Sequence, residues 1–330
     1  MKKLLFILSA LLLLFSACKT DFEINAKWKD IPVVFGLLNQ KDTTHYIIIS
    51  KAFLGDNNAL LTAQNPDSCY YNVNNLNVRI EEWKNNSQTN NWILDTTTIY
   101  NKEQGTFSYP KQVIYKFEEP NLDINAEYRL FITNKITGKI ISSKTNLIHN
   151  FSIIKPVSSA SLNFTSINPI PIRWNTASNG KLYQVVMRFS YKETNTITNQ
   201  STIKSIDWSL GSYKSQSIDG NESLETNYNG TSFYSFLHDN IDVSPNLIRS
   251  IAGMYPVELI FSVATDDFNK YMEVNSPSTG VLQYKPEFTN INNGIGLFSS
   301  RFQVINKHYM NSISIDSLFN GSFTKDLNFQ

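Results

Sequence analysis

The sequence lacks the residue patterns on which most enzymes depend. Its 330 residues include two cysteines and four histidines, and these do not recur at the spacing of a metal site. HExxH, CxxC, GxSxG and Walker-type glycine loops are all missing. We therefore predict that the protein is not an enzyme, and we expect no catalytic residue, no metal site and no cofactor.

An excess of charge of one sign is missing as well. The chain has 29 basic and 28 acidic residues, and the loss of Lys2 and Lys3 with a signal peptide would leave 27 basic residues. We expect no nucleic-acid partner, because such a partner requires a basic surface. The sequence also has no apolar run of the roughly 20 residues that a transmembrane helix needs.

The first 18 residues instead have the order of an export signal. Lys2 and Lys3 precede an apolar block, residues 4–15, that is too short to span a bilayer. The block leads into the sequence FSAC, which resembles the lipobox of bacterial lipoproteins. This resemblance implies that residues 1–17 are a lipoprotein signal peptide and that Cys18 carries lipid, which anchors the protein to a membrane.

A short lipidated tether, residues 18–30, is expected to follow the signal peptide. Within it, Asp21, Phe22 and Glu23 resemble the acidic export signal that sends Bacteroidota lipoproteins to the outside of the cell. The resemblance implies an outer-membrane lipoprotein that faces the cell exterior. The alternative interpretation is a solvated spacer, since polar side chains are favoured in any linker beside a membrane.

Alternation of apolar and polar residues dominates the rest of the sequence. It predicts strands over residues 76–81, 128–133, 183–190 and 259–264. In the last two strands the alternation places Gln184 and Ser262 on the face opposite the apolar residues, which include Tyr183 and Phe261. Clusters of Gly, Asn and Asp between strands are typical of turns, and no long stretch has a helical period. We predict an all-β fold.

Length and strand spacing predict two antiparallel β-sandwich domains in series. The first, residues 31–150, has an Ig-like number of strands. The second, residues 151–330, contains Trp174 followed by Tyr183, which resembles the B and C strands of fibronectin type III modules, and ends in a C-terminal extension. We expect Trp174 in the core. Acylation of the other cysteine leaves Cys69 without a disulfide partner, so we expect a buried thiol there.

Two stretches of the chain resemble a known group of proteins. They are VVFGLLNQKDTTHYIIISKAFLGDNNALLTAQNPDSCYY near the start and NINNGIGLFSSRF near the end. Both are similar to uncharacterised lipoproteins of Bacteroidota that share a domain of unknown function. The resemblance implies an all-β outer-membrane lipoprotein. It also implies a partner in the same membrane, a barrel or a TonB-dependent transporter, because relatives are often found beside such transporters.

Two pairs of residues have a specific local interpretation. Gly294 and Gly296 lie in an otherwise apolar strand, where we expect them to permit a close backbone approach or a bulge. Asp266 and Asp267 are expected in a solvated turn, because calcium, the alternative, needs six to eight oxygen ligands and few are local.

The sequence leaves two classes of function open. The first is a non-enzymatic accessory or binding subunit of an outer-membrane complex. Its expected partner surface includes Phe53 and Leu54, because they begin the longest non-alternating stretch of the first domain and long loops often carry contacts. The second is a stand-alone lipoprotein of the cell surface or periplasm that binds glycan or peptide. Its stacking surface would be built from exposed aromatic residues: Tyr70, Tyr71, Trp83 and Trp92.

The acidic segment after Cys18 generates the first testable prediction. Replacing Asp21, Phe22 and Glu23 with alanine should leave the protein lipidated and folded but facing the periplasm, because the change removes only the two charges and the aromatic ring that a sorting receptor would read. Protease shaving of intact cells, with a periplasmic protein as control, measures the orientation. If the unaltered protein resists the protease while a known surface protein is digested, the export interpretation is wrong.

Overall fold

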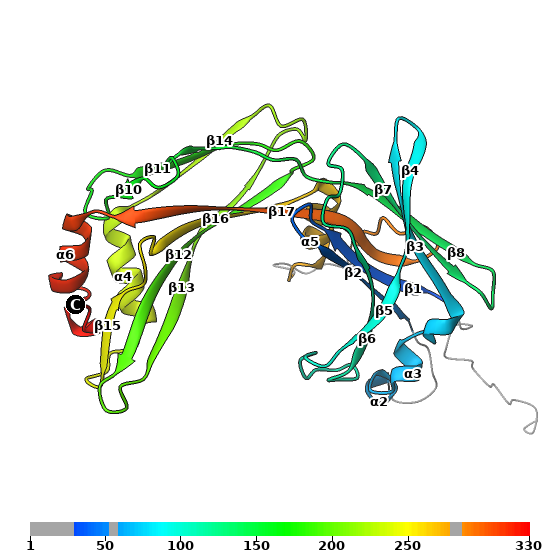
Figure 1. Ribbon diagram of the computed structural model, residues 1–330, viewed down its shortest axis with the longest axis horizontal. Helices are drawn as coiled ribbons and strands as arrows, with labels where there is room; N and C mark the ends of the chain where they lie inside the picture. Colours follow the sequence, from blue (N-terminus) through cyan, green and yellow to red (C-terminus); the bar gives the residue numbers. More distant parts are fainter. Residues whose placement is uncertain (1–29, 53–58, 278–285) are drawn as a thin grey trace, which may run out of the picture.

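The computed structural model describes residues 30–52, 59–277 and 286–330, and strands dominate it (Figure 1). It is 47% strand and 16% helix, which confirms the β-rich prediction. Across these residues, no helix combines the length and the apolar character needed to cross a bilayer.

Three sheets form the structure. The long sheet has eight strands in one path: β13 (Ser201–Lys214), β12 (Leu182–Asn195), β16 (Val257–Ala264), β17 (Ile295–Met310), β1 (Pro32–Leu38), β2 (Thr44–Lys51), β6 (Gln112–Glu118) and β5 (Asp95–Ile99). Two short strands join it from the side: β10 (Ser161–Leu162) beside β17, and β15 (Leu247–Ile251) beside β12. The four-stranded sheet runs β4 (Ser87–Ile93), β3 (Leu76–Lys84), β7 (Glu127–Asn134) and β8 (Ile140–Asn146). The three-stranded sheet runs β14 (Ser223–Tyr228), β11 (Ile170–Asn175) and β9 (Ile153–Lys155).

Short helices lie between and beside the strands. They are α2 (Ala59–Ala63), α3 (Pro66–Cys69), α4 (Gly230–Asn240), α5 (Asp266–Asn275) and α6 (Ser312–Asn320), with 3-10 turns at Val73–Asn75 and Lys325–Leu327. Asp266 and Asp267 begin α5, so the expectation of a solvated turn was wrong. Thr265 caps this helix by accepting a hydrogen bond from the Phe268 backbone N–H. The negative charges of Asp266 and Asp267 stabilise the helix because they lie at the positive end of its dipole.

Each smaller sheet packs on the long sheet across its own hydrophobic core. The first core, which includes Val34, Ile47 and Ile80, lies under the four-stranded sheet. The second core, which includes Trp174 and Phe261, lies under the three-stranded sheet and is closed by α4 and α6. The predicted core position of Trp174 is confirmed, since its side chain is fully buried. Cys69 is also buried, as expected, and its Sγ donates to the Ala63 carbonyl.

Strand β17 belongs to both cores and makes the long sheet continuous (Figure 1). Its first half pairs in parallel with β1, and residues 301–308 pair antiparallel with β16. Phe298 packs in the first core and Phe302 in the second. Because alternate residues of a strand share one face, both smaller sheets cover the same face of the long sheet. We call the opposite face the open face; it lines the inside of the arch in Figure 1.

This arrangement differs from two antiparallel sandwiches that simply follow each other. The parallel partner of β1 comes from the other end of the chain, and local alternation carries no information about which strands pair. The Ig-like and fibronectin III-like assignments, and the boundary near residue 150, stay predictions.

Gly296 permits the parallel contact between β1 and β17. It pairs with Val34 and has a φ of +114°, a conformation that side chains with a Cβ rarely adopt. A Cβ on Gly296 would collide with the Val34 carbonyl oxygen, and a Cβ on Gly294 would lie 2.9 Å from the Pro32 carbonyl oxygen. The predicted close backbone approach is confirmed.

The variant Gly296→Ala should therefore lower the free energy of unfolding by about 1–3 kcal/mol, through overpacking against Val34. Thermal unfolding followed by circular dichroism measures the loss. Gly105→Ala is the matched control, because a Cβ added at that glycine would have no heavy atom within 4 Å. An equal Tm for the two variants would contradict the proposed role of Gly296.

Candidate functional site

The residues expected from the sequence to carry lipid, the export signal or the partner surface all lie outside the described part of the chain. They are Cys18, Asp21, Phe22, Glu23, Phe53 and Leu54. The nearest described strand residue to Phe53 is Lys51, which pairs with Pro32 at the start of β1. The structure instead places a hollow near Leu37, at the opposite end of the same strand.

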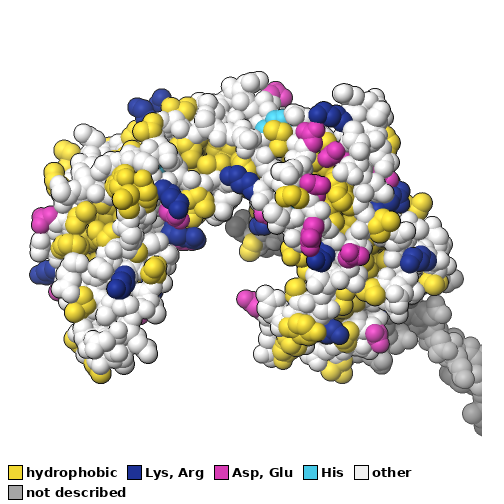
Figure 2. Space-filling view, viewed as in Figure 1, with side chains coloured by type: hydrophobic (Ala, Val, Ile, Leu, Met, Phe, Trp, Pro, Cys, Tyr) yellow, Lys and Arg dark blue, Asp and Glu magenta, His cyan; other side chains and the backbone are white. Residues whose placement is uncertain are grey.

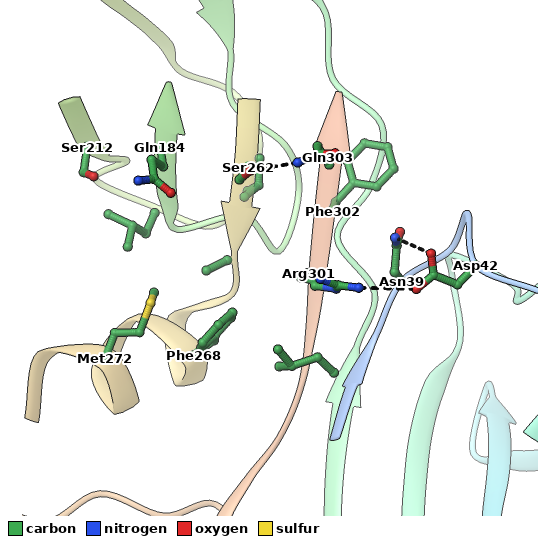
Figure 3. Close-up of a pocket in the computed structure, with 14 residues that line it drawn as sticks. Asn39, Asp42, Gln184, Ser212, Ser262, Phe268, Met272, Arg301, Phe302 and Gln303 are labelled. Atoms are coloured by element: carbon green, nitrogen blue, oxygen red, sulfur yellow. Dashed lines mark hydrogen bonds and ion pairs between the residues drawn. The ribbon is translucent and has the colours of Figure 1, made fainter. Parts of the chain in front are cut away.

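This main hollow has a volume of about 530 Å³ and lies on the open face beside α5 (Figure 3). A second hollow of about 210 Å³ adjoins it over β1 and β2. The two share Leu37, Asp42 and Arg301. Figure 2 shows the molecule deeply hollowed between its two halves, with basic side chains on the left side of the opening.

Four uncharged polar side chains cross the floor of the main hollow. Gln184 pairs with Ser212 on one side and with Ser262 on the other, and Ser262 pairs with Gln303. We call these four residues the polar row. Gln303 Nε2 donates to Ser262 Oγ at 3.1 Å, whereas the side chains of Gln184 and Ser212 make no hydrogen bond within the described residues (Figure 3). Two members of the row are thus free to bind a ligand.

The walls of the main hollow are apolar and come from α5 and from the sheet. Phe268 and Met272 project from this helix, and Leu37 and Leu182 lie on the sheet. Two contacts hold α5 over the open face. Lys214 of β13 forms an ion pair with Glu273, and the ring of Tyr271 meets Phe35 of β1 edge-on at 5.2 Å between centroids.

Charged groups gather where the two hollows meet. Asp42 Oδ1 accepts a hydrogen bond from Asn39 Nδ2 at 2.9 Å. Arg301 extends from β17 toward the other carboxylate oxygen of Asp42, and its Nη2 stays 3.7 Å away (Figure 3). That separation is longer than a hydrogen bond.

Sequence reasoning assigned part of this site correctly. Tyr183 and Phe261 are fully buried, so Gln184 and Ser262 do lie on the opposite side of their strands, as the alternation predicts. The sequence did not predict the polar row itself, because the row forms only when β12 pairs with both β13 and β16, and β16 pairs with β17. No local pattern in the sequence predicts those pairings.

The aromatic residues considered for sugar stacking are engaged elsewhere in the protein. Trp83 lies under the Arg129 guanidinium at 4.0 Å, and Trp92 packs against Phe117. The Tyr71 hydroxyl donates to Asp30, and the hydroxyl of Tyr70 accepts from Lys102. None of these four aromatic residues lines the main hollow.

Two buried histidines carry no contact suited to acid–base chemistry at the hollow. His45 borders the second hollow, and its Nε2 donates to the Glu119 carbonyl at 3.0 Å. His308 is fully buried, and its Nδ1 donates to the Ala160 carbonyl at 3.2 Å. Burial lowers the pKa of both histidines below 6.5, and the carbonyl hydrogen bonds offset only part of this effect. In the described residues, no three His, Cys, Asp or Glu side chains are grouped to hold a metal ion.

No model of a known protein family matches the sequence. No curated protein matches it. Among solved structures, the chain is similar to the C-terminal globular domain of oligosaccharyltransferase from Pyrococcus abyssi, at 10% identity and a TM-score of 0.26. The match covers 70% of this chain and 47% of that one, so the chain spans about half the length of that structure. A TM-score this low carries no argument about fold or function.

The lowered pKa of His308 predicts a pH-dependent stability. Between pH 7.5 and 5.5 the unfolded chain takes up a proton at this residue more readily than the folded chain, so stability should fall as the pH drops below about 6.5. His308→Gln should reduce the difference in Tm between the two pH values. The exposed residue His238 provides the control variant, His238→Gln. An undiminished Tm difference in His308→Gln would contradict the prediction.

Proposed function

We propose that the protein is a non-enzymatic accessory or binding subunit of an outer-membrane complex, anchored by lipid on Cys18 and facing the cell exterior. Its partner is a barrel or TonB-dependent transporter, which the family resemblance suggests. The observation that carries the proposal is the open face, where the polar row and the apolar walls of the main hollow remain accessible. The opposite face is covered by the two smaller sheets.

The open face suits a protein partner because it combines three kinds of surface. The polar row offers hydrogen-bonding groups, Phe268 and Met272 offer apolar contacts, and Arg301 offers a charge at the junction of the hollows. Protein interfaces commonly combine apolar contacts with direct hydrogen bonds in this way. In this proposal the two cores belong to an Ig-like and a fibronectin III-like sandwich that share β17.

A stand-alone lipoprotein that binds glycan or peptide is the second candidate. The volume of the main hollow favours it, because about 530 Å³ is within the usual range of small-molecule sites. This candidate needs no membrane partner.

Site-specific photocrosslinking in native cells tests the first candidate. A photoreactive residue at Gln303, in the polar row, should crosslink one outer-membrane protein. The same residue at Ile167, which is 88% exposed but lies in a loop before β11, should not. If Gln303 yields no crosslinked protein, or both positions give the same products, the open face is not a partner surface. Binding of glycan or peptide by the purified chain would then support the second candidate.

A further inference from the structure

Arg301 differs from every other arginine of the chain in its pairing. The sequence has six arginines, and the structure describes all of them. Five donate a guanidinium hydrogen bond to a carboxylate: Arg79 to Glu81, Arg129 to Glu127, Arg173 to Glu225, Arg188 to Asp207 and Arg249 to Glu193. Arg301 makes no such bond within the described residues, and its nearest carboxylate oxygen, on Asp42, is 3.7 Å away.

The guanidinium of Arg301, held only by this long ion pair with Asp42, lies where a ligand could reach it. Arg301 borders both hollows, its side chain is 58% exposed, and its cross-strand neighbour on β16 is Ala264, which offers no charge. Lys214 of β13, two residues beyond Ser212 of the lining, is already paired with Glu273. Among the described residues that line the main hollow, Arg301 is the basic one, while Lys41 nearby donates to the Gln303 carbonyl and lies over the Phe302 ring.

The chemistry of this position favours a carboxylate. A guanidinium presents parallel N–H donors that match the two oxygens of a carboxylate. The Asp42 carboxylate nearby would repel a doubly charged phosphate more strongly than a singly charged group. A ligand carboxylate can accept the guanidinium hydrogen bonds of Arg301 that Asp42, at 3.7 Å, is too far away to accept.

The remaining lining favours a peptide over an acidic sugar. Sugar rings bind best against a fully exposed aromatic face, and neither ring that lines the hollow offers one: Phe268 is half-buried and Phe302 is buried in the second core. Leu182 and Met272 offer half-buried flexible apolar contacts that suit an aliphatic side chain. The unpaired Gln184 amide can both donate to and accept from a peptide group.

We propose that Arg301 anchors a carboxylate-bearing peptide segment of the partner, with the adjoining residues lying over the polar row and against Met272. This inference rests on the proposed function, because it specifies what occupies the open face. The carboxylate is either an acidic side chain or a free C-terminus, and both present the same two oxygens to the guanidinium.

Affinity selection with synthetic peptides on the purified full chain in detergent tests the inference. The probes are three randomised hexapeptide sets, each with one leucine. The first set has a single Asp or Glu and an amidated C-terminus. The second, the uncharged amidated set, replaces that acid with Asn or Gln and keeps the amidated C-terminus. The third has no charged side chain but has a free C-terminus. Oligogalacturonate serves as the acidic-sugar probe. At least one carboxylate set should be retained, and which one it is distinguishes a side chain from a C-terminus; the uncharged amidated set should not be retained.

Variants then locate the binding. Arg301→Gln should weaken the selected peptides by at least about tenfold, and Arg301→Lys by less, because lysine keeps the charge but loses the fork. Arg173→Gln is the matched control on the three-stranded sheet and should bind as the unaltered protein does. Four outcomes would overturn the inference. They are retention of no peptide, retention of the uncharged amidated set equal to that of the carboxylate sets, binding of the sugar alone, and unchanged peptide affinity in Arg301→Gln.

The two proposals fail in different ways. If the Gln303 crosslink to an outer-membrane protein persists at full yield in Arg301→Gln, the inference about the carboxylate is wrong while the binding subunit stands. If the unaltered protein crosslinks no partner but the peptides bind through Arg301, the accessory role is wrong and the carboxylate site stands.

Discussion

The parallel contact between β1 and the first half of β17 is the constraint on which the rest of the structure depends. It pairs six positions from opposite ends of the chain, and the backbones approach closely where Gly296 pairs with Val34. Through this contact one strand enters both hydrophobic cores. Without it, the strands around the first core and those around the second would form separate sheets, and the open face would not be continuous.

The open face depends on this continuity. Asp42 follows β1, while Gln184 lies on β12 and Gln303 on β17, so the main hollow draws on strands from both halves of the chain. Helix α5 leaves β16 and covers the face only in part, held by the Lys214–Glu273 ion pair and the Phe35–Tyr271 contact. The covered part fixes one wall of the hollow, and the uncovered part leaves the polar row exposed.

Local properties of the fold could be predicted from the sequence, whereas its long-range pairing could not. Alternation identified the strands around Val78, Leu130 and Phe261 and their buried faces. Periodicity alone does not predict the helix start at Asp266, although Thr265 followed by two acids is a typical N-cap sequence. Arg301 has no local sequence signal, because it is one polar residue in an alternating strand. The lack of a carboxylate hydrogen bond at its guanidinium is evident only once the fold has paired the other five arginines.

The direction of the β1–β17 pairing also has a mechanical consequence. In the proposed lipoprotein the anchored segment precedes the start of β1, whereas β17 leads into the second core at its far end. Under the proposed lipid anchorage, a pulling force between that anchor and a partner bound at the second core would draw these two parallel strands past each other lengthwise. The interstrand hydrogen bonds of the six paired positions would then share the load at the same time instead of opening one after another. The two halves of the protein are therefore joined in shear, the geometry in which a small number of backbone hydrogen bonds resists tension best.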